Sequence, residues 1–222
     1  MTKNFEERRK ALVKQLEDYR YIRGPNAKKI KKAMLKIKRE DFVMPEHRIN
    51  AYDDNPLPIP ADATISAPHM HAIYLSAIEL KAGDKVLEIG AGSGILLAYV
   101  KEIVGSKGKV VGVEIIPEVY RFAKNNLEKA GYQKKVSLIL GDGSKGLEKK
   151  KFDKILISAT CPEIPTTLLD QLKAGGMIIA PIGEPYGRQE LVCVKKEKDG
   201  KASMKSLGSV AFVPLRGEYG WK

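Results

Sequence analysis

The chain has 222 residues, of which 43% are hydrophobic and 30% charged, and its formal net charge is +12. This length and apolar content suit one domain, residues 1–222, with a complete hydrophobic core. Two cysteines, a charged start (MTKNFEERRK) and the lack of a run of ~20 apolar residues argue against a disulfide scaffold, a signal peptide and a membrane-spanning helix. We therefore expect a cytoplasmic protein that acts as a monomer and does not enter membranes.

The positive charge is concentrated near the N-terminus. Residues 1–50 hold fifteen Lys and Arg against seven Asp and Glu, which leaves an excess of only four positive charges for the other 172 residues. A solvated helix face is the simpler interpretation, and a phosphate-binding surface is the alternative. Because no nucleic-acid-binding module accompanies the charge, we expect no specific nucleic-acid partner. The excess includes one basic run, made up of Lys28, Lys29, Lys31, Lys32, Lys36, Lys38 and Arg39.

The N-terminal region is predicted to be helical and then irregular. Amphipathic periodicity predicts helices over 4–20 and 26–39, separated by the helix-breaking pair Gly24-Pro25. Residues 41–62 hold four prolines and are expected to be irregular.

From residue 71 onward, helices and strands alternate. Segments 190–197 and 203–215 then look like an antiparallel hairpin. The alternating elements are a helix over 71–80, a strand over 85–89, a helix over 94–104, a strand over 109–114, a helix over 117–130, strands over 136–140 and 152–158, a helix over 165–173 and a strand over 176–182. This order is typical of parallel βαβ units. We therefore predict an α/β fold: a doubly wound, mostly parallel, Rossmann-like sheet with antiparallel C-terminal strands and added N-terminal helices.

A glycine-rich loop, GAGSG (90–94), joins the first predicted strand to the helix that follows it. Gly90, Gly92 and Gly94 allow the backbone a tight turn and a close approach to a ligand. The next strand ends on Glu114, a position suited to the two hydroxyls of a ribose. Enzymes that bind NAD, FAD or S-adenosylmethionine share these features, so the loop alone does not choose among them.

Three details favour S-adenosylmethionine. The glycine spacing is G-x-G-x-G, and Glu88 lies two residues before the first glycine, where it can hold an ammonium group. A later strand ends in LGDG (140–143), which places Asp142 and Gly143 at the same sheet edge, with Asp142 suited to an adenine amino group. A nicotinamide enzyme is the alternative, but it would need a second mononucleotide-binding half. The pattern therefore favours a class I methyltransferase domain.

Other chemistries lack their motifs. The segment SATCPEIP (158–165) lacks the Asp/Asn-Pro-Pro-aromatic loop of enzymes that methylate DNA amines. In it Cys161 precedes a proline, whereas the pyrimidine C5 enzymes place their nucleophile after one, so we interpret Cys161 as a small buried residue. His69 and His71 lie two residues apart without plausible partners, and we predict no metal site.

The segment ATISAPHMHA (63–72) places small polar residues directly before an apolar helix. It resembles, nearly residue for residue, the signature of the protein-L-isoaspartate (D-aspartate) O-methyltransferases. The resemblance extends over residues 45–220, because VLEIGAGSGI, the GDG motif, LKAGGMIIAPIG and FVPLRGE follow in the order typical of that family. General methyltransferases do not carry the TISAPHM element, which makes it the more specific signal.

The resemblance implies an enzyme that transfers a methyl group from S-adenosyl-L-methionine to the free carboxylate of L-isoaspartyl residues in damaged proteins. The second product is S-adenosyl-L-homocysteine, and the ester would close to a succinimide, which begins repair. D-aspartyl residues are a second candidate acceptor. An isoaspartyl carboxyl with a pKa of about 4 is already an anion at pH 7, so it needs desolvation and alignment rather than a general base.

The resemblance also implies roles for particular residues. Ser66 would be the catalytic residue that orients the substrate carboxylate, and Thr64 would make a similar contact. His69 would reach the cofactor or the substrate, whereas His71, two residues further on, is expected to be structural. In FVPLRGE, the backbone around Val213 and Leu215 would pair with the substrate peptide as an added strand.

Each of these assignments has a structural alternative. Ser66 or Thr64 can serve as the N-cap of the next helix, the two histidines can be packed structural residues, and Val213 and Leu215 can belong to the core of an edge strand. The alternative functions are an RNA or small-molecule methyltransferase and a binding protein without catalysis.

The chain departs from the family pattern at two positions. Asp62 adds a negative charge near an anionic substrate, and Glu88 stands where many methyltransferases have aspartate. We divide the expected methyltransferase domain into basic N-terminal helices (1–50), a substrate and cofactor loop (51–72), a cofactor-binding core (73–183) and a C-terminal hairpin with a substrate-binding segment (184–222).

Overall fold

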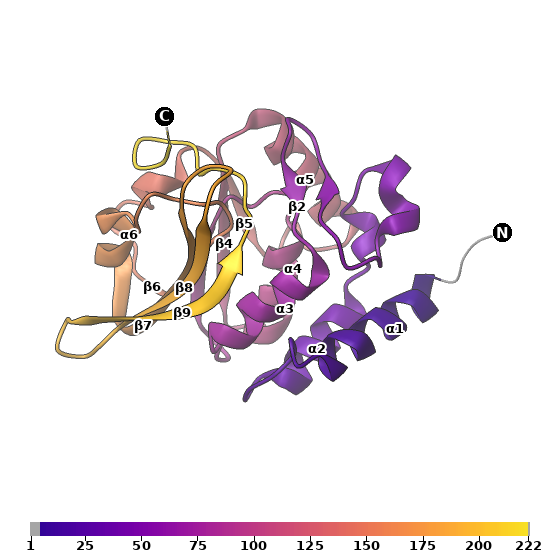
Figure 1. Ribbon diagram of the computed structural model, residues 1–222, viewed down its shortest axis with the longest axis horizontal. Coiled ribbons are helices and arrows are strands. Elements are labelled where there is room, and N and C mark those ends of the chain that lie inside the picture. The colour runs from indigo at the N-terminus through magenta and orange to yellow at the C-terminus, as the bar shows by residue number, and fades with distance from the viewer. Residues whose placement is uncertain (1–4, 222) are drawn as a thin grey trace.

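A computed structural model describes residues 5–221 and has a central seven-stranded sheet (Figure 1). Its strands are β3 (Lys85–Ile89), β4 (Lys109–Glu114), β5 (Ser137–Leu140), β6 (Phe152–Ile157), β7 (Leu172–Gly183), β8 (Gln189–Lys196) and β9 (Ala202–Val210). Their spatial order is β5-β4-β3-β6-β7-β8-β9. The first five in this order are parallel to their neighbours, whereas β7, β8 and β9 pair antiparallel. The predicted α/β fold with antiparallel C-terminal strands is confirmed.

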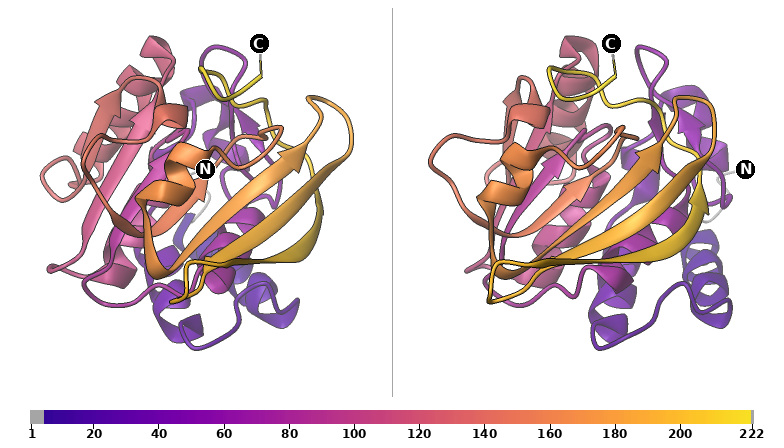
Figure 2. Two further views of the ribbon diagram at one scale, coloured as in Figure 1. Left: turned by 90° about the vertical axis from the view of Figure 1, so that its left-hand side faces the viewer. Right: turned by 60° about the vertical axis from the view of Figure 1, so that its left-hand side comes forward.

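Each face of the sheet carries its own hydrophobic core, because alternate strand residues point to opposite faces. Val86 and Leu156 belong to the core on the face of helices α3 (Pro68–Ala77), α4 (Ile95–Val104) and α5 (Pro117–Lys129). The neighbouring Leu87 and Ile155 belong to the core on the other face, with α6 (Thr166–Gln171). Figure 2 shows α6 and the N-terminal helices on opposite sides of the sheet.

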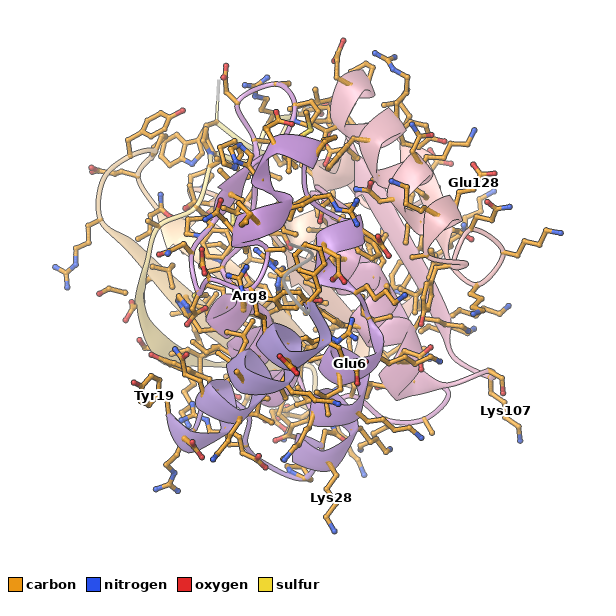
Figure 3. The ribbon with its side chains drawn as sticks, turned by 90° about the vertical axis from the view of Figure 1, so that its right-hand side faces the viewer. Glu6, Arg8, Tyr19, Lys28, Lys107 and Glu128 are labelled. Atoms are coloured by element: carbon orange, nitrogen blue, oxygen red, sulfur yellow. The ribbon has the colours of Figure 1, made fainter. Side chains whose placement is uncertain are left out.

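The N-terminal helices α1 (Phe5–Asp18) and α2 (Ala27–Lys36) pack on α3 and α4. Their apolar faces are buried through residues such as Leu16 and Ile30, and the charged side chains point outward, as Lys28 does in Figure 3. Lys36 forms an ion pair with Glu102 at 2.8 Å. These contacts favour the solvated-face interpretation of the basic run. No helix within residues 5–221 has the length and apolar character needed to cross a membrane.

Several helix boundaries differ from prediction by two or three residues. α2 ends at Lys36 rather than at residue 39, because Ile37 is extended and a 3₁₀ turn, Arg39–Asp41, follows. α3 begins at Pro68 rather than at residue 71, with Ala67 as its N-cap and no side-chain cap. The N-cap interpretation of Ser66 and Thr64 is therefore wrong. Residue 4, the expected start of the first helix, lies outside the described residues.

The expected strand over 203–215 is correct only in its first part. β9 ends at Val210, and the Gln189 side chain then holds the backbone of Phe212 on both sides: the Phe212 amide donates to Oε1 (2.6 Å) and Nε2 donates to the Phe212 carbonyl (3.0 Å). Residues 211–215 consequently leave the sheet. The irregular segment 41–62 holds a 3₁₀ turn, Pro45–Asn50, and the short strand β1 (Leu57–Pro58), which pairs antiparallel with β2 (Thr64–Ile65).

Candidate active site

One cavity lies at the carboxyl ends of β3, β4 and β6, and it encloses about 1100 Å³, open mouth included. Ligands of parallel α/β sheets bind at this edge. Four segments supply most of its lining: 61–66, 88–93, 113–116 and 213–216. The predicted site residues Thr64, Ser66, Glu88, Gly90, Gly92, Glu114, Gly143, Val213 and Leu215 are among the lining residues.

The glycine loop and Glu114 line the cavity together. The amide of Gly92 donates to Glu114 Oε2 and the amide of Ile116 donates to Oε1, both at 3.0 Å. These two bonds fix the carboxylate, and each oxygen keeps a lone pair for a further donor such as a ribose hydroxyl. Gly94 does not line the cavity. A Cβ at Gly94 would lie 3.1 Å from Leu127 Cγ, so this glycine permits the packing of α4 against α5 instead of ligand contact.

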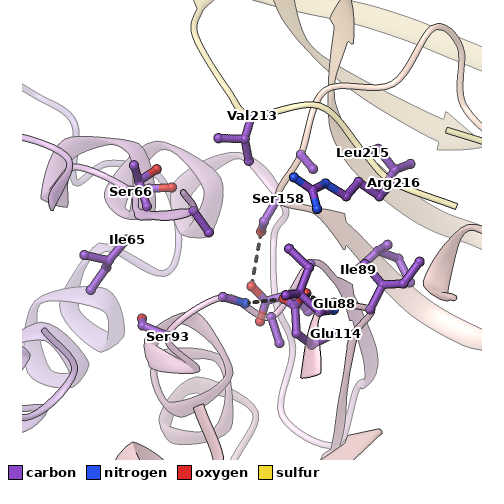
Figure 4. A pocket seen from close by; sticks show the side chains of 18 of the residues that line it. Ile65, Ser66, Glu88, Ile89, Ser93, Glu114, Ser158, Val213, Leu215 and Arg216 are labelled. Carbon is purple, nitrogen blue, oxygen red and sulfur yellow. Dashed lines mark hydrogen bonds between the residues drawn. The ribbon is translucent and has the colours of Figure 1, made fainter. Parts of the chain in front are cut away.

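Glu88 is the most strongly perturbed acid in the cavity. Its side chain is 2% exposed; Ser158 Oγ donates to Oε1 at 3.1 Å, and Oε2 is buried without a partner (Figure 4). Burial raises the pKa of the Glu88 carboxyl well above its usual range, the nearby charge of Glu114 adds to the rise, and the Ser158 bond opposes it. This oxygen can accept a hydrogen bond from a ligand donor such as an ammonium group.

Asp142 lies beside the cavity but outside its lining. Its carboxylate accepts from the Ser144 amide (2.9 Å) and hydroxyl (2.6 Å) and from the Glu218 amide (2.8 Å). Burial alone would raise the pKa of Asp142, but the hydrogen bonds from Ser144 and Glu218 lower it below its usual value. Asp142 therefore orders this loop, and its neighbour Gly143 reaches the cavity.

Ser66 lies on the loop between β2 and α3, half-buried at the cavity wall. Its carbonyl accepts a hydrogen bond from Arg39 Nη2 at 2.9 Å, and its hydroxyl has no partner among residues 5–221. Thr64 lies in β2 and is exposed. A serine hydroxyl without an internal partner is available to a ligand.

The two histidines differ in their place relative to the cavity. The His69 amide and Nδ1 contact Asp54 Oδ1 at 2.8 and 3.0 Å, and its ring lies 5.4 Å from that of Tyr21, away from the cavity lining. His71, expected to be structural, is buried and lines the cavity. Burial, with the charge of Arg39 as a smaller cause, holds the pKa of His71 well below its usual value. His71 is therefore a neutral lining group.

The segment 213–216 forms one side of the cavity, but part of its backbone is already paired. The Thr160 amide donates to the Val213 carbonyl and the Leu215 amide donates to the Thr160 carbonyl, both at 2.8 Å. Leu215 is buried in the core on the α6 face, so its structural interpretation holds for the side chain. These existing bonds limit the pairing of a substrate peptide, as an added strand, with the backbone of Val213 and Leu215. Arg216, which the sequence did not single out, also lines the cavity (Figure 4).

Sequence reasoning missed Ser158, Arg216 and Tyr186, all lining residues. Ser158 follows β6 at the edge where Glu88 and Glu114 lie, so the strand-end rule offered a signal for it. Tyr186 and Arg216 come from irregular segments, which gave none. Across residues 5–221, no three His, Cys, Asp or Glu side chains gather as a metal site would require.

The comparisons with known proteins agree with this geometry. The family model described as Protein-L-isoaspartate(D-aspartate) O-methyltransferase (PCMT) matches residues 7–220. The chain is 46% identical to the protein-L-isoaspartate O-methyltransferase of Hyperthermus butylicus, over 98% of this chain and 92% of the relative. It is 51% identical to that of Thermococcus onnurineus, over 88% and 89%.

Solved structures show the same likeness. A protein-L-isoaspartate O-methyltransferase from Plasmodium falciparum, in complex with S-adenosyl-L-homocysteine, superposes with a TM-score of 0.82 at 28% identity, over 93% of this chain and 97% of that one. The family match spans nearly the whole chain, and Glu88, Glu114 and the glycine loop line one cavity. The chain belongs to the protein-L-isoaspartate (D-aspartate) O-methyltransferase family and is an S-adenosylmethionine-dependent methyltransferase.

Proposed function

We propose that this chain esterifies the free carboxylate of L-isoaspartyl residues in damaged proteins and that Ser66 orients that carboxylate. The observation that carries the assignment is the Ser66 hydroxyl, which has no partner among the described residues and lies on the wall of the cavity that also holds the glycine loop. When bound, S-adenosylmethionine supplies the methyl group on an electrophilic sulfonium. The chain's task is to align the acceptor carboxylate and to remove its water.

The residues divide into two sets around the cavity. Glu88 Oε2 would hold the ammonium group of the cofactor, and the Glu114 carboxylate would hold its ribose. The backbone of the glycine loop would lie against the cofactor. Ser66 and Thr64 come from the segment 61–66 and would hold the acceptor. An isoaspartyl carboxylate is ionised at neutral pH, so a single hydroxyl can align it without taking a proton from it.

We propose a narrower form of peptide pairing at the segment 213–216. Thr160 already occupies the Val213 carbonyl and the Leu215 amide. The Pro214 carbonyl has no hydrogen-bond partner among residues 5–221, and the Val213 side chain lines the cavity. These groups would contact the peptide main chain next to the damaged residue. Binding would then depend little on the side chains that flank that residue in the peptide.

We also propose that residues 1–222 act as one domain, as a cytoplasmic monomer without a nucleic-acid partner. The one-domain proposal is supported by the cavity, whose lining comes from the 51–72, 73–183 and 184–222 parts, and by Arg39, which bonds Ser66 from the 1–50 part. Size-exclusion chromatography with light scattering tests the monomer. Binding of RNA that weakens steeply with salt would argue against the peptide substrate.

The reaction is tested with two peptides that differ only in one residue, isoaspartate in one and aspartate in the other. Base-labile label from S-adenosylmethionine on the isoaspartyl peptide alone supports the proposal. Ser66→Ala should lower kcat by roughly 100-fold, since it removes one positioned donor, and should leave the affinity for S-adenosylhomocysteine unchanged. Ser209→Ala, at an exposed position of β9, is the matched control. Full activity of Ser66→Ala would refute the role of Ser66.

A further inference from the structure

Arg39 is the exception in the basic run of residues 28–39. Lys28, Lys32 and Lys36 are exposed, whereas Arg39 is 1% exposed, in the 3₁₀ turn that follows α2. Its Nη2 donates to the Ser66 carbonyl at 2.9 Å, across 27 residues of sequence. The N-terminal region therefore touches the catalytic loop directly, through one buried cation.

Arg39 has one nearby acid, Asp54, whose charge favours the cation, but the two side chains form no ion pair. The Nε and Nη1 of Arg39 are buried and have no hydrogen-bond partner within residues 5–221, and no acid forms an ion pair with it there. Glu40 accepts a hydrogen bond from the Tyr52 hydroxyl, and Asp54 is occupied by the amide and ring of His69. Burial lowers the pKa of Arg39 to about 10, so the side chain is still a cation at neutral pH.

An unpaired buried charge lowers stability, because its desolvation is not offset by a partner. Packing alone does not account for Arg39, since an apolar side chain of similar length would fill the same space without this cost. Its one hydrogen bond to a described residue goes to the main chain of Ser66. His71, the lining residue whose pKa the Arg39 charge helps to depress, is neutral and does not compensate it.

We propose that Arg39 is a positioning residue that fixes the Ser66 loop and supplies a positive charge behind it that no ion pair holds, so that the cavity selects an anionic acceptor over a neutral one. Arg39 itself does not line the cavity. The charge therefore attracts the carboxylate from behind the loop without forming an ion pair that would reduce its nucleophilicity. The inference rests on the proposed role of Ser66 and adds the origin of its selectivity for a charged acceptor.

The test compares binding of two peptides, one isoaspartyl and one isoasparaginyl, which carries a neutral carboxamide in place of the free carboxylate. In Arg39→Met, the preference for the anionic peptide should fall about tenfold, as expected for one charge in partly screened surroundings. The affinity for S-adenosylhomocysteine should stay within about twofold, because the cofactor groups lie on other segments. Arg39→Lys should keep the charge preference but lose turnover, since it cannot reproduce the guanidinium bond to Ser66.

Lys154→Met is the matched control, because Lys154 is also a buried cation, 5% exposed, and its Nζ contacts Met177 Sδ on β7, away from the cavity. It should leave the preference unchanged. Equal weakening of both peptides by Arg39→Met, or no weakening, overturns the proposal. If Arg39→Met does not fold, Arg39→Lys decides: loss of its charge preference, or unchanged turnover, is the overturning result. Ser66→Ala with full activity would refute the role of Ser66 while the two-peptide preference still tests the charge of Arg39.

Discussion

Asp142 and Gly217 lie in contact, although 75 residues separate them in the sequence. Gly217 has a φ of +128°, and a Cβ there would overlap the Asp142 carboxylate. The contact allows the next amides to bond the same loop: Glu218 N donates to Asp142 Oδ2 at 2.8 Å and Tyr219 N donates to Ser144 Oγ at 3.1 Å. The C-terminal segment thus supports the loop that carries Gly143 into the cavity.

Gly217→Ala should therefore damage both stability and cofactor binding. The substitution combines an unfavourable φ with a clash, and we expect a loss of roughly 2–4 kcal/mol in the free energy of unfolding. Because the Asp142 loop would shift, S-adenosylhomocysteine should bind about tenfold more weakly. Gly131→Ala separates the two causes: Gly131 has a φ of +74° but nothing within 4 Å of its Cβ position. Gly131→Ala should lower the free energy of unfolding by about 1 kcal/mol and leave the binding of S-adenosylhomocysteine unchanged. Equal binding by both variants would contradict the supporting role of the contact.

Cys161 should take no part in the reaction. It is fully buried, its Sγ donates weakly to the Pro181 carbonyl at 3.4 Å, and burial raises the pKa of its thiol to about 12. The thiolate needed for nucleophilic attack is therefore absent at neutral pH. Cys161→Ala should keep kcat and lower the free energy of unfolding by about 1–2 kcal/mol, and iodoacetamide should label the native protein only slowly. Rapid labelling, or lost methyl transfer with intact cofactor affinity, would contradict this.

The parts of the site that the sequence predicted well lie at strand ends. The strands around Glu88 and Glu114 are short apolar runs, and parallel strands bring their carboxyl ends to one edge, so the two acids and the glycine loop could be placed from the pattern alone. Ser158 follows the same rule. The sequence did not distinguish the glycines that line the cavity from the one that does not. Gly94 has a positive φ as Gly90 does, but Leu127 of α5 lies against it.

The parts that failed depend on tertiary contacts. Side chains two residues apart on a helix point to nearly opposite faces. Whether His69 or His71 faces the cavity therefore depends on how α3 is rotated about its axis. The burial of Tyr74 and Leu75 in the core fixes that rotation. The end of β9 depends on the side chain of Gln189, which no periodicity reveals. Arg39 looked like one more solvated cation because its neighbours in the run are exposed.

Glu88 links cofactor binding to pH. Burial raises the pKa of its carboxyl above the ordinary value of 4.5, so without cofactor the folded protein holds this proton more tightly than the unfolded chain does. The contribution of Glu88 to stability is thus fully present below pH 4.5 and is lost as pH rises through the raised pKa. This direction is opposite to that of a salt-bridged carboxylate.

An ammonium group at Glu88 Oε2 would favour the ionised carboxylate, so binding of S-adenosylhomocysteine should release a proton in the window between pH 4.5 and the raised pKa. The affinity should accordingly rise with pH there, by up to about tenfold per pH unit, and level off above it. Calorimetry in two buffers of different ionisation enthalpy measures the released proton directly. Glu88→Gln cannot ionise, so its affinity should be weaker and the Glu88 proton should no longer be released. The same proton release in wild type and Glu88→Gln would mean that another group titrates and that Glu88 does not hold the ammonium.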